Sequence, residues 1–92
     1  QTAEKAGVLG FTRSFAKTVA PEIRVNMVSP GWIATSFSEK HMQEEYFQAR
    51  IKEIPLGCFG KPEDVAAAVV FLASEESSYL SGESININGG LV

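Results

Sequence analysis

Apolar or small side chains recur at intervals of three and four residues over 3–20, while Arg13 and Lys17 share the opposite, polar face. This spacing predicts an amphipathic helix. Leu9 and Phe11 widen its apolar surface beyond one stripe, so we expect a sheet on one side and a second surface, such as another subunit, on the other. Pro21 ends the helix, because a proline disfavours helical geometry at the residue before it.

Two later segments alternate between apolar and polar residues, which is the period of a strand. The first is 23–29, where Ile23, Val25 and Met27 share one face and a Pro-Gly pair follows. The second is 83–88, which ends at a Gly-Gly pair. The pattern predicts two strands, one near the middle of the chain and one near its end.

The residues between these strands predict helices. Segment 36–53 mixes charged and aromatic residues without Gly or Pro, which indicates one or two exposed helices. Another helix begins near Pro62, because proline suits the first helical turn and Glu63 and Asp64 there favour the helix dipole. Its body, 65–73, is apolar nearly all round, so we expect it to be buried between a sheet and another layer.

The order strand, buried helix, strand predicts a βαβ unit, whose strands run parallel. Two strands alone make a poor sheet, since stable open sheets generally need three or more strands with both faces covered. We therefore expect an α/β fold in which residues 1–92 form the C-terminal part of a single doubly wound parallel-sheet domain whose N-terminal part is absent.

Composition narrows the function classes. The 92 residues are 45% hydrophobic and carry a net charge of −3 without a basic cluster, which argues against nucleic acid as a partner. The longest apolar run, 65–73, is far shorter than the roughly 20 residues of a membrane-spanning helix, and no export leader is seen. One cysteine and one histidine cannot form a structural zinc site, so no metal is expected, and a cytoplasmic location fits.

Several short motifs stand in a specific order. They are Lys5-Ala6-Gly7-Val8 with Thr12-Arg13-Ser14, Ile23-Arg24-Val25-Asn26, Ser29-Pro30-Gly31 with Ile33 and Thr35, Pro55-Leu56-Gly57, Phe59-Gly60-Lys61-Pro62-Glu63-Asp64-Val65-Ala66, Phe71-Leu72-Ala73-Ser74, and Ser81-Gly82 with Gly89-Gly90. In this order and spacing the chain resembles, over essentially its whole length, the C-terminal third of the short-chain dehydrogenase/reductase family. The 3-oxoacyl-acyl-carrier-protein reductase-like members are the most similar. The resemblance implies a Rossmann fold and an oxidoreductase that uses NAD or NADP.

The resemblance also implies roles for individual residues. Lys5 would be the catalytic lysine, which holds the nicotinamide ribose and lowers the pKa of a catalytic tyrosine four residues before it. That position is Gln1 here. Two explanations stay open: an inactivated reductase with Gln at the tyrosine position, or a fragment whose N-terminal residues are shifted, misassigned or cut away. Pro30 and Gly31 would border the cofactor, the backbone of Ile33 would meet the nicotinamide carboxamide, and the Thr35 hydroxyl would bind carboxamide or pyrophosphate oxygen. The mobile flap over the substrate would include Phe37, Met42, Tyr46 and Phe47, although aromatic and apolar side chains in this pattern also fit ordinary helix packing.

Two functional readings remain open. In the first, the chain is a segment of an enzyme that reduces a ketone or 3-oxoacyl group, or oxidises the corresponding alcohol, as a homotetramer or homodimer. In the second, it is a catalytically dead remnant or pseudoenzyme that acts as an oligomerisation or interaction module. The absence of the family's G-x-G-x-x-G phosphate loop from the 92 residues predicts that they neither bind dinucleotide well nor turn over substrate alone.

Overall fold

The computed structural model describes residues 3–91, except for the side chains of 37–39. Its elements follow the order predicted from the sequence: α1 (Ala3–Val19), β1 (Met27–Pro30), α2 (Ser36–His41), α3 (Glu44–Glu53), α4 (Pro62–Ala73), a short 3-10 helix (Glu75–Ser77) and β2 (Ser84–Ile87). The region predicted as one or two helices therefore forms two. The break between them falls at Met42 and Gln43, and Gln43 has extended backbone geometry.

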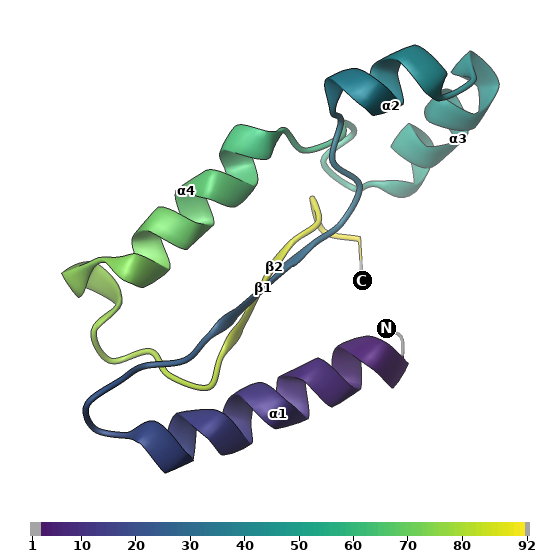
Figure 1. Cartoon of the computed structure of the whole chain (residues 1–92). Coiled ribbons are helices and arrows are strands. Elements are labelled where there is room, and N and C mark those ends of the chain that lie inside the picture. The colour runs from purple at the N-terminus through teal and green to yellow at the C-terminus, as the bar shows by residue number, and fades with distance from the viewer. Residues whose placement is uncertain (1–2, 92) are drawn as a thin grey trace.

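The two strands pair in parallel, as predicted, with Met27 opposite Ser84 and Pro30 opposite Ile87. Helices α1 and α4 lie on opposite sides of the strands (Figure 1). Helix α4 contacts both strands, whereas the buried Ala16 of α1 lies against Gly82, in the turn before β2. The described chain is thus an α/β arrangement with a helix on each face of a parallel sheet.

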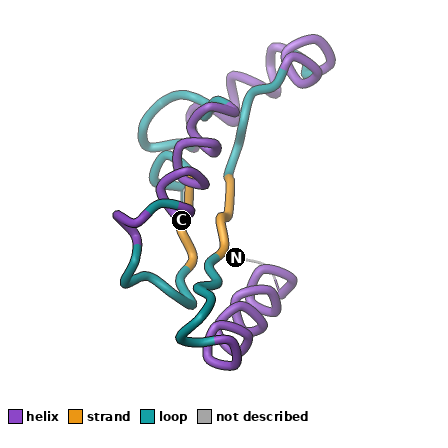
Figure 2. The backbone as a smooth tube through the Cα atoms, turned by 60° about the vertical axis from the view of Figure 1, so that its left-hand side comes forward, coloured by secondary structure: helices purple, strands orange, loops and turns teal. Residues whose placement is uncertain are grey.

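Helices α2 and α3 lie beyond the carboxyl ends of the strands, at the far end from the turn that joins α1 to β1 (Figure 2). Both ends of this segment are tied to the rest of the fold by backbone hydrogen bonds. The N–H of Ala34 donates to Gly60 at 2.8 Å, and the N–H of Leu56 donates to Gly89 at 3.0 Å. Gly89 has a φ of 63°, and a Cβ there would lie 2.7 Å from Ile54 Cγ2, so this junction requires glycine.

Strand β1 begins four residues later than the alternation predicts. Over the preceding residues, side-chain hydrogen bonds accompany a single backbone bond, which the Gly82 N–H donates to the Val25 carbonyl at 2.7 Å. The Asn26 amide donates to the Leu80 carbonyl at 3.0 Å and accepts from the Glu83 N–H at 3.0 Å. The Val25 N–H donates to the Ser81 hydroxyl at 3.2 Å. Residues 23–26 are therefore held beside the 80–83 turn without forming strand pairs.

The buried apolar core of the described residues is small and comprises Ala16, Ile54 and Phe59. The outward face of α4 stays open, with Val69 50% and Val70 67% exposed. The second layer expected over this helix is thus not found within the described residues. On α1, Val8, Phe11 and Phe15 are likewise exposed, at 51%, 67% and 43%.

Candidate active site

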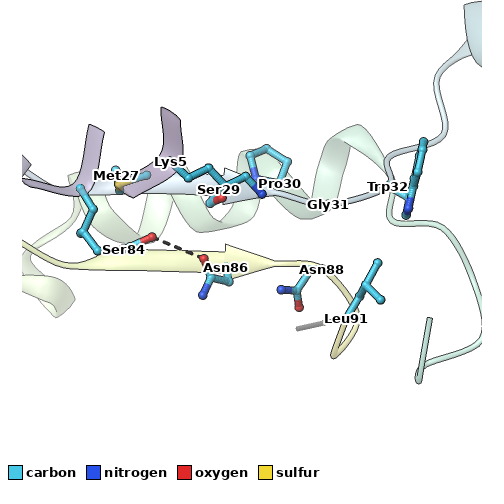
Figure 3. A pocket seen from close by; sticks show the side chains of 11 residues that line it. Lys5, Met27, Ser29, Pro30, Gly31, Trp32, Ser84, Asn86, Asn88 and Leu91 are labelled. Carbon is cyan, nitrogen blue, oxygen red and sulfur yellow. Dashed lines mark hydrogen bonds between the residues drawn. The ribbon is translucent and has the colours of Figure 1, made fainter. Parts of the chain in front are cut away.

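A cavity of about 630 Å³ lies between α1 and the sheet. Lys5 reaches it from the first turns of α1, and Ser29, Pro30 and Gly31 reach it from the carboxyl end of β1. Figure 3 shows the Lys5 side chain extending along β1 toward Ser29 and Pro30. Ligands of open parallel sheets gather beyond the carboxyl ends of the strands, so this is where chemistry is expected. The other lining residues are Leu9, Met27, Trp32, Ser84, Asn86, Asn88 and Leu91.

Gly31 holds the two strand ends together at this edge. Its N–H donates to the carbonyl of Ile87 at 2.8 Å. A Cβ on Gly31 would lie 2.9 Å from Asn88 Cβ and 3.0 Å from Asn88 Cα, closer than real Cβ atoms normally approach a backbone carbon. The turn after β1 therefore requires glycine because the end of β2 occupies the space of a side chain.

The segment after Gly31 is fixed by a second parallel pairing, between Ile33 and Gly60. It uses the carbonyl of Trp32, which accepts from the Gly60 N–H at 3.0 Å, and the N–H of Ala34, which donates to the Gly60 carbonyl at 2.8 Å. In a parallel pair of this kind, the N–H and C=O of the central residue point to the opposite side. The Ile33 backbone thus turns one donor and one acceptor away from Gly60.

Thr35 lies on the other side of this segment. It lines a second cavity of about 570 Å³, which α3 and the first turn of α4 close. Its walls include Ala34, Ser36, Phe47, Ile51, Cys58, Phe59, Lys61, Pro62 and Glu63. The structure therefore gathers Lys5, Pro30 and Gly31 at the first cavity and Thr35 at the second, with Ile33 on the segment that connects them.

The flap residues fall into two groups. Phe47 of α3 is half-buried and stacks on Phe59, with ring centroids 4.6 Å apart. Tyr46 is 45% exposed, meets the Trp32 ring edge-on at 6.2 Å and carries the Arg50 guanidinium 4.8 Å above its own ring. Met42 is half-buried at the junction of α2 and α3. The predicted flap residue Phe37 lies in α2, but its side chain is outside the described residues, as is Gln1.

Sequence reasoning missed two aromatic residues of this site. Trp32 lines the first cavity and contacts Phe59 at a centroid distance of 5.9 Å. Phe59 is only 7% exposed although it lies in a glycine-containing loop. A large aromatic ring directly after the strand-ending Pro-Gly pair was the available signal for Trp32. For Phe59 the signal was a large aromatic side chain between turn residues. Exposing such a ring to water is unfavourable, so a buried position could have been expected.

Other kinds of site find no support in the described part of the chain. Within residues 3–91, no group of three or more His, Cys, Asp or Glu residues is placed to hold a metal ion. No helix among them has the length and apolar character needed to cross a membrane. The thiol of Cys58 is exposed.

Comparison with known proteins identifies the family. A family model described as Enoyl-(Acyl carrier protein) reductase matches residues 1–92. The chain is 53% identical over 91 residues to a 3-oxoacyl-[acyl-carrier-protein] reductase of Thermotoga maritima, with 98% of the chain and 37% of that protein covered. It is 50% identical over 88 residues to the corresponding reductase of Aquifex aeolicus, with 95% of the chain and 35% of that protein covered.

A solved structure gives the same answer for the fold. It is a crystal structure of a short-chain dehydrogenase/reductase, glucose/ribitol dehydrogenase, from Brucella melitensis. Its TM-score is 0.86 at 34% sequence identity, over 98% of this chain and 36% of that one. The present chain thus spans little more than a third of the length of these relatives. On sequence and fold together, it belongs to the short-chain dehydrogenase/reductase family and adopts part of that family's parallel-sheet Rossmann fold.

Proposed function

We propose that these residues form the nicotinamide side of the cofactor site and the substrate flap of an NAD(P)-dependent oxidoreductase. The reaction is the reduction of a 3-oxoacyl group or similar ketone, or oxidation of the corresponding alcohol. The choice of a 3-oxoacyl substrate is supported by similarity to relatives such as the Thermotoga maritima reductase, which is 53% identical. The family's phosphate loop has no counterpart among these 92 residues, and the position expected for the catalytic tyrosine is Gln1.

The orientation of the Ile33 backbone carries this proposal. A nicotinamide carboxamide has one carbonyl acceptor and an NH₂ donor group. The Ile33 N–H and C=O, turned away from the Gly60 pairing, form the complementary pair of groups on one residue. Because both neighbours of Ile33 are tied to Gly60, this pair is held in place before any ligand arrives, which lowers the entropic cost of binding.

Lys5 supplies the positive charge at the same edge. Its ammonium group has three donors, which suit the vicinal hydroxyls of a ribose, and its position in the cavity places it near Pro30 and Gly31. When bound, the dinucleotide supplies or accepts the hydride of the reaction. The role we assign to Lys5 is to orient the cofactor and to favour, through its charge, the ionised form of a phenol that a residue other than Gln1 would have to supply.

The flap accounts for the substrate side. Tyr46 and Phe47 present rings at the end of the sheet where Ile33 and Thr35 lie, and Met42 lies at the junction of the two flap helices. Apolar and aromatic groups exclude water from a carbonyl that is being reduced, and they contact an acyl chain. We therefore assign the flap to contacts with the substrate's apolar part.

The test uses the complete protein that carries these 92 residues. Calorimetric titration with NADH and with NADPH measures binding, and loss of absorbance at the nicotinamide band with a 3-oxoacyl thioester measures turnover. We expect binding of at least one dinucleotide and turnover of the thioester. A complete protein that binds neither dinucleotide would contradict the proposal.

The exposed apolar faces of α1 and α4 support a homo-oligomer, a dimer or tetramer, as the working form. Phe11 and Phe15 stack on each other at 5.6 Å on the outside of α1, and Val70 is 67% exposed on α4. Clustered exposed apolar groups of this size favour burial against another protein surface. They also favour the second candidate function, a pseudoenzyme that only binds partners. Oligomerisation without dinucleotide binding would select that candidate, and a cytoplasmic location is expected for both.

A further inference from the structure

The flap and the cofactor segment meet at one side chain that lies outside the site as predicted from sequence. Phe59 stacks on Phe47 of the flap helix α3, with centroids 4.6 Å apart and rings 27° from parallel. It also contacts the ring of Trp32, with a centroid distance of 5.9 Å. Phe59 is 7% exposed, so its orientation is fixed by these neighbours.

The residue next to Phe59 fixes the cofactor segment by a different kind of contact. Gly60 holds Trp32 and Ala34 through two backbone hydrogen bonds, of 3.0 and 2.8 Å. A Cβ on Gly60 would lie 2.8 Å from Ile33 Cδ1, so the approach is close. One dipeptide therefore touches both parts of the site, the flap through a ring and the cofactor segment through its backbone.

We propose that Phe59 is a positioning residue that sets the flap helix α3 over the substrate side of the Ile33 segment. This inference rests on the proposed function, since it assigns the flap to the substrate and Ile33 to the cofactor. Loss of the Phe59 ring removes the stacking partner of Phe47 but leaves the backbone bonds of Gly60 in place. The substrate should therefore be held less well, while the dinucleotide binds as before.

The experiment compares Phe59→Ala with Leu56→Ala in the complete protein. Leu56 is a matched control, because it lies in the same loop and is 76% exposed. We expect Phe59→Ala to raise KM for the 3-oxoacyl thioester about tenfold, with kcat and the Kd of the preferred dinucleotide changed less than about twofold. Leu56→Ala should behave as the wild type. A residue needed only for folding would instead lower the active fraction and leave KM unchanged.

Trypsin gives a readout that does not depend on activity. Arg50 and Lys52 lie within α3, and cleavage after them requires this helix to leave its place. We expect Phe59→Ala to cleave there about tenfold faster than the wild type or Leu56→Ala, as measured by mass spectrometry. If the complete protein has no reductase activity, the proposed function fails, and flap cleavage alone then supports or overturns the role of Phe59.

Two further variants keep the test decisive where Phe59→Ala does not fold. Phe59→Leu keeps most of the side-chain volume but lacks the aromatic ring. Its KM should lie between the values of the wild type and of Phe59→Ala. Phe47→Ala removes the same contact from the flap side, together with a ring that we assign to the substrate, so it should raise KM at least as much and cleave as fast. The double variant of Phe47 and Phe59 should be no worse than the worse single variant, because both remove one contact. Wild-type KM and flap cleavage in Phe59→Ala or Phe47→Ala would overturn the proposal.

Discussion

The two ends of β1 are held in different ways. At its amino end, two backbone bonds, from Met27 to Glu83 and from Gly82 to Val25, are joined by a network from one side chain. The guanidinium of Arg24 donates to the carbonyls of Leu72, Ser74, Ser77 and Leu80 at 2.8 to 3.3 Å. It also donates to the Ser77 hydroxyl at 3.2 Å. These acceptors belong to the end of α4 and the turn after it, so one side chain joins that region to the start of β1.

At the carboxyl end of β1, backbone hydrogen bonds and aromatic contacts join the neighbouring segments. Gly31 and Gly60 bring segments together through backbone hydrogen bonds, and the rings of Trp32 and Phe59 contact each other. Lys5 lies at the edge of this region, and the polar groups of the Ile33 backbone face outward from it. At the amino end, the side chains of Arg24 and Asn26 thus bond to backbone groups of the protein itself, whereas at the carboxyl end the N–H and C=O of Ile33 point away from Gly60.

The largest expected effect on stability comes from removing the Arg24 hydrogen bonds at the amino end of β1. Arg24→Met removes donors to five acceptor atoms, and several of these lie in a partly buried region. Charge-assisted hydrogen bonds contribute up to about 3 kcal/mol each, and the bonds of one side chain are not additive. We expect a loss of about 3 kcal/mol in the free energy of unfolding, measured by urea denaturation of the complete protein.

The matched control for Arg24 is Arg13→Met, on the exposed surface of α1. It should change stability by less than about 0.5 kcal/mol. The fraction of Arg24→Met that remains folded should keep the KM of the wild type, since the carboxyl end is intact. A large KM change without loss of stability would contradict this division between the two ends.

The next effect in size concerns the carboxyl end. Lys5→Met keeps the length of the side chain and removes its charge from the cavity edge. We expect kcat/KM to fall about 100-fold, in the range that loss of a group supporting proton transfer produces. Stability should stay within about 0.5 kcal/mol, because Lys5 is exposed in the first turns of α1. Lys17→Met, in the last turn of the same helix, is the control and should leave both quantities unchanged.

A smaller effect is expected where the two strand ends touch. Gly31→Ala places a Cβ 2.9 Å from Asn88 Cβ and 3.0 Å from its Cα, so the end of β2 has to shift. Overpacking of this kind costs about 1 to 3 kcal/mol. We expect a stability loss in this range together with weaker dinucleotide binding, measured by denaturation and calorimetry. Gly7→Ala, where a Cβ meets nothing within 4 Å, should cause neither.

The smallest expected effect is at Thr35. Thr35→Val keeps the shape of the side chain and removes its hydroxyl, which we assign to the cofactor. A single neutral hydrogen bond contributes about 1 kcal/mol, so the dinucleotide Kd should rise about fivefold. Thr35→Ser should restore most of the affinity. If Thr35→Val binds the dinucleotide with the Kd of the wild type, the assignment of Thr35 to the cofactor site is wrong.

The difference between the two ends also explains what sequence could predict. The alternation around Met27 and the Pro-Gly pair after it predicted a strand and its end, because these signals are local. The resemblance to relatives drew attention to Lys5 and Ile33. The role of Arg24 could not be predicted, because its acceptors lie 48 to 56 positions away in the sequence. Period-two reasoning therefore placed Arg24 on a strand that begins only at Met27.

At the carboxyl end of β1, the apolar contacts were likewise not predictable from local sequence patterns. Phe47 was predicted as a flap residue, but its partner Phe59 comes from a loop, where residue spacing gives no period to read. Trp32 lies between two residues of the predicted cofactor segment, yet only the fold brings its ring against Tyr46 and Phe59. Pairings between distant loops depend on the path of the whole chain, so the local pattern does not contain them.

The two backbone ties that close the segment carrying α2 and α3, at Ala34 and at Leu56, have a consequence for how the protein can change over evolution. Because the ends of this segment are fixed, its length can vary with little effect on the sheet. Doubling a flexible loop costs only about 0.6 kcal/mol of additional closure entropy. Insertions and deletions between these ties are therefore a low-cost route by which the segment that we assign to the substrate can change while the Ile33 segment keeps its backbone pairing.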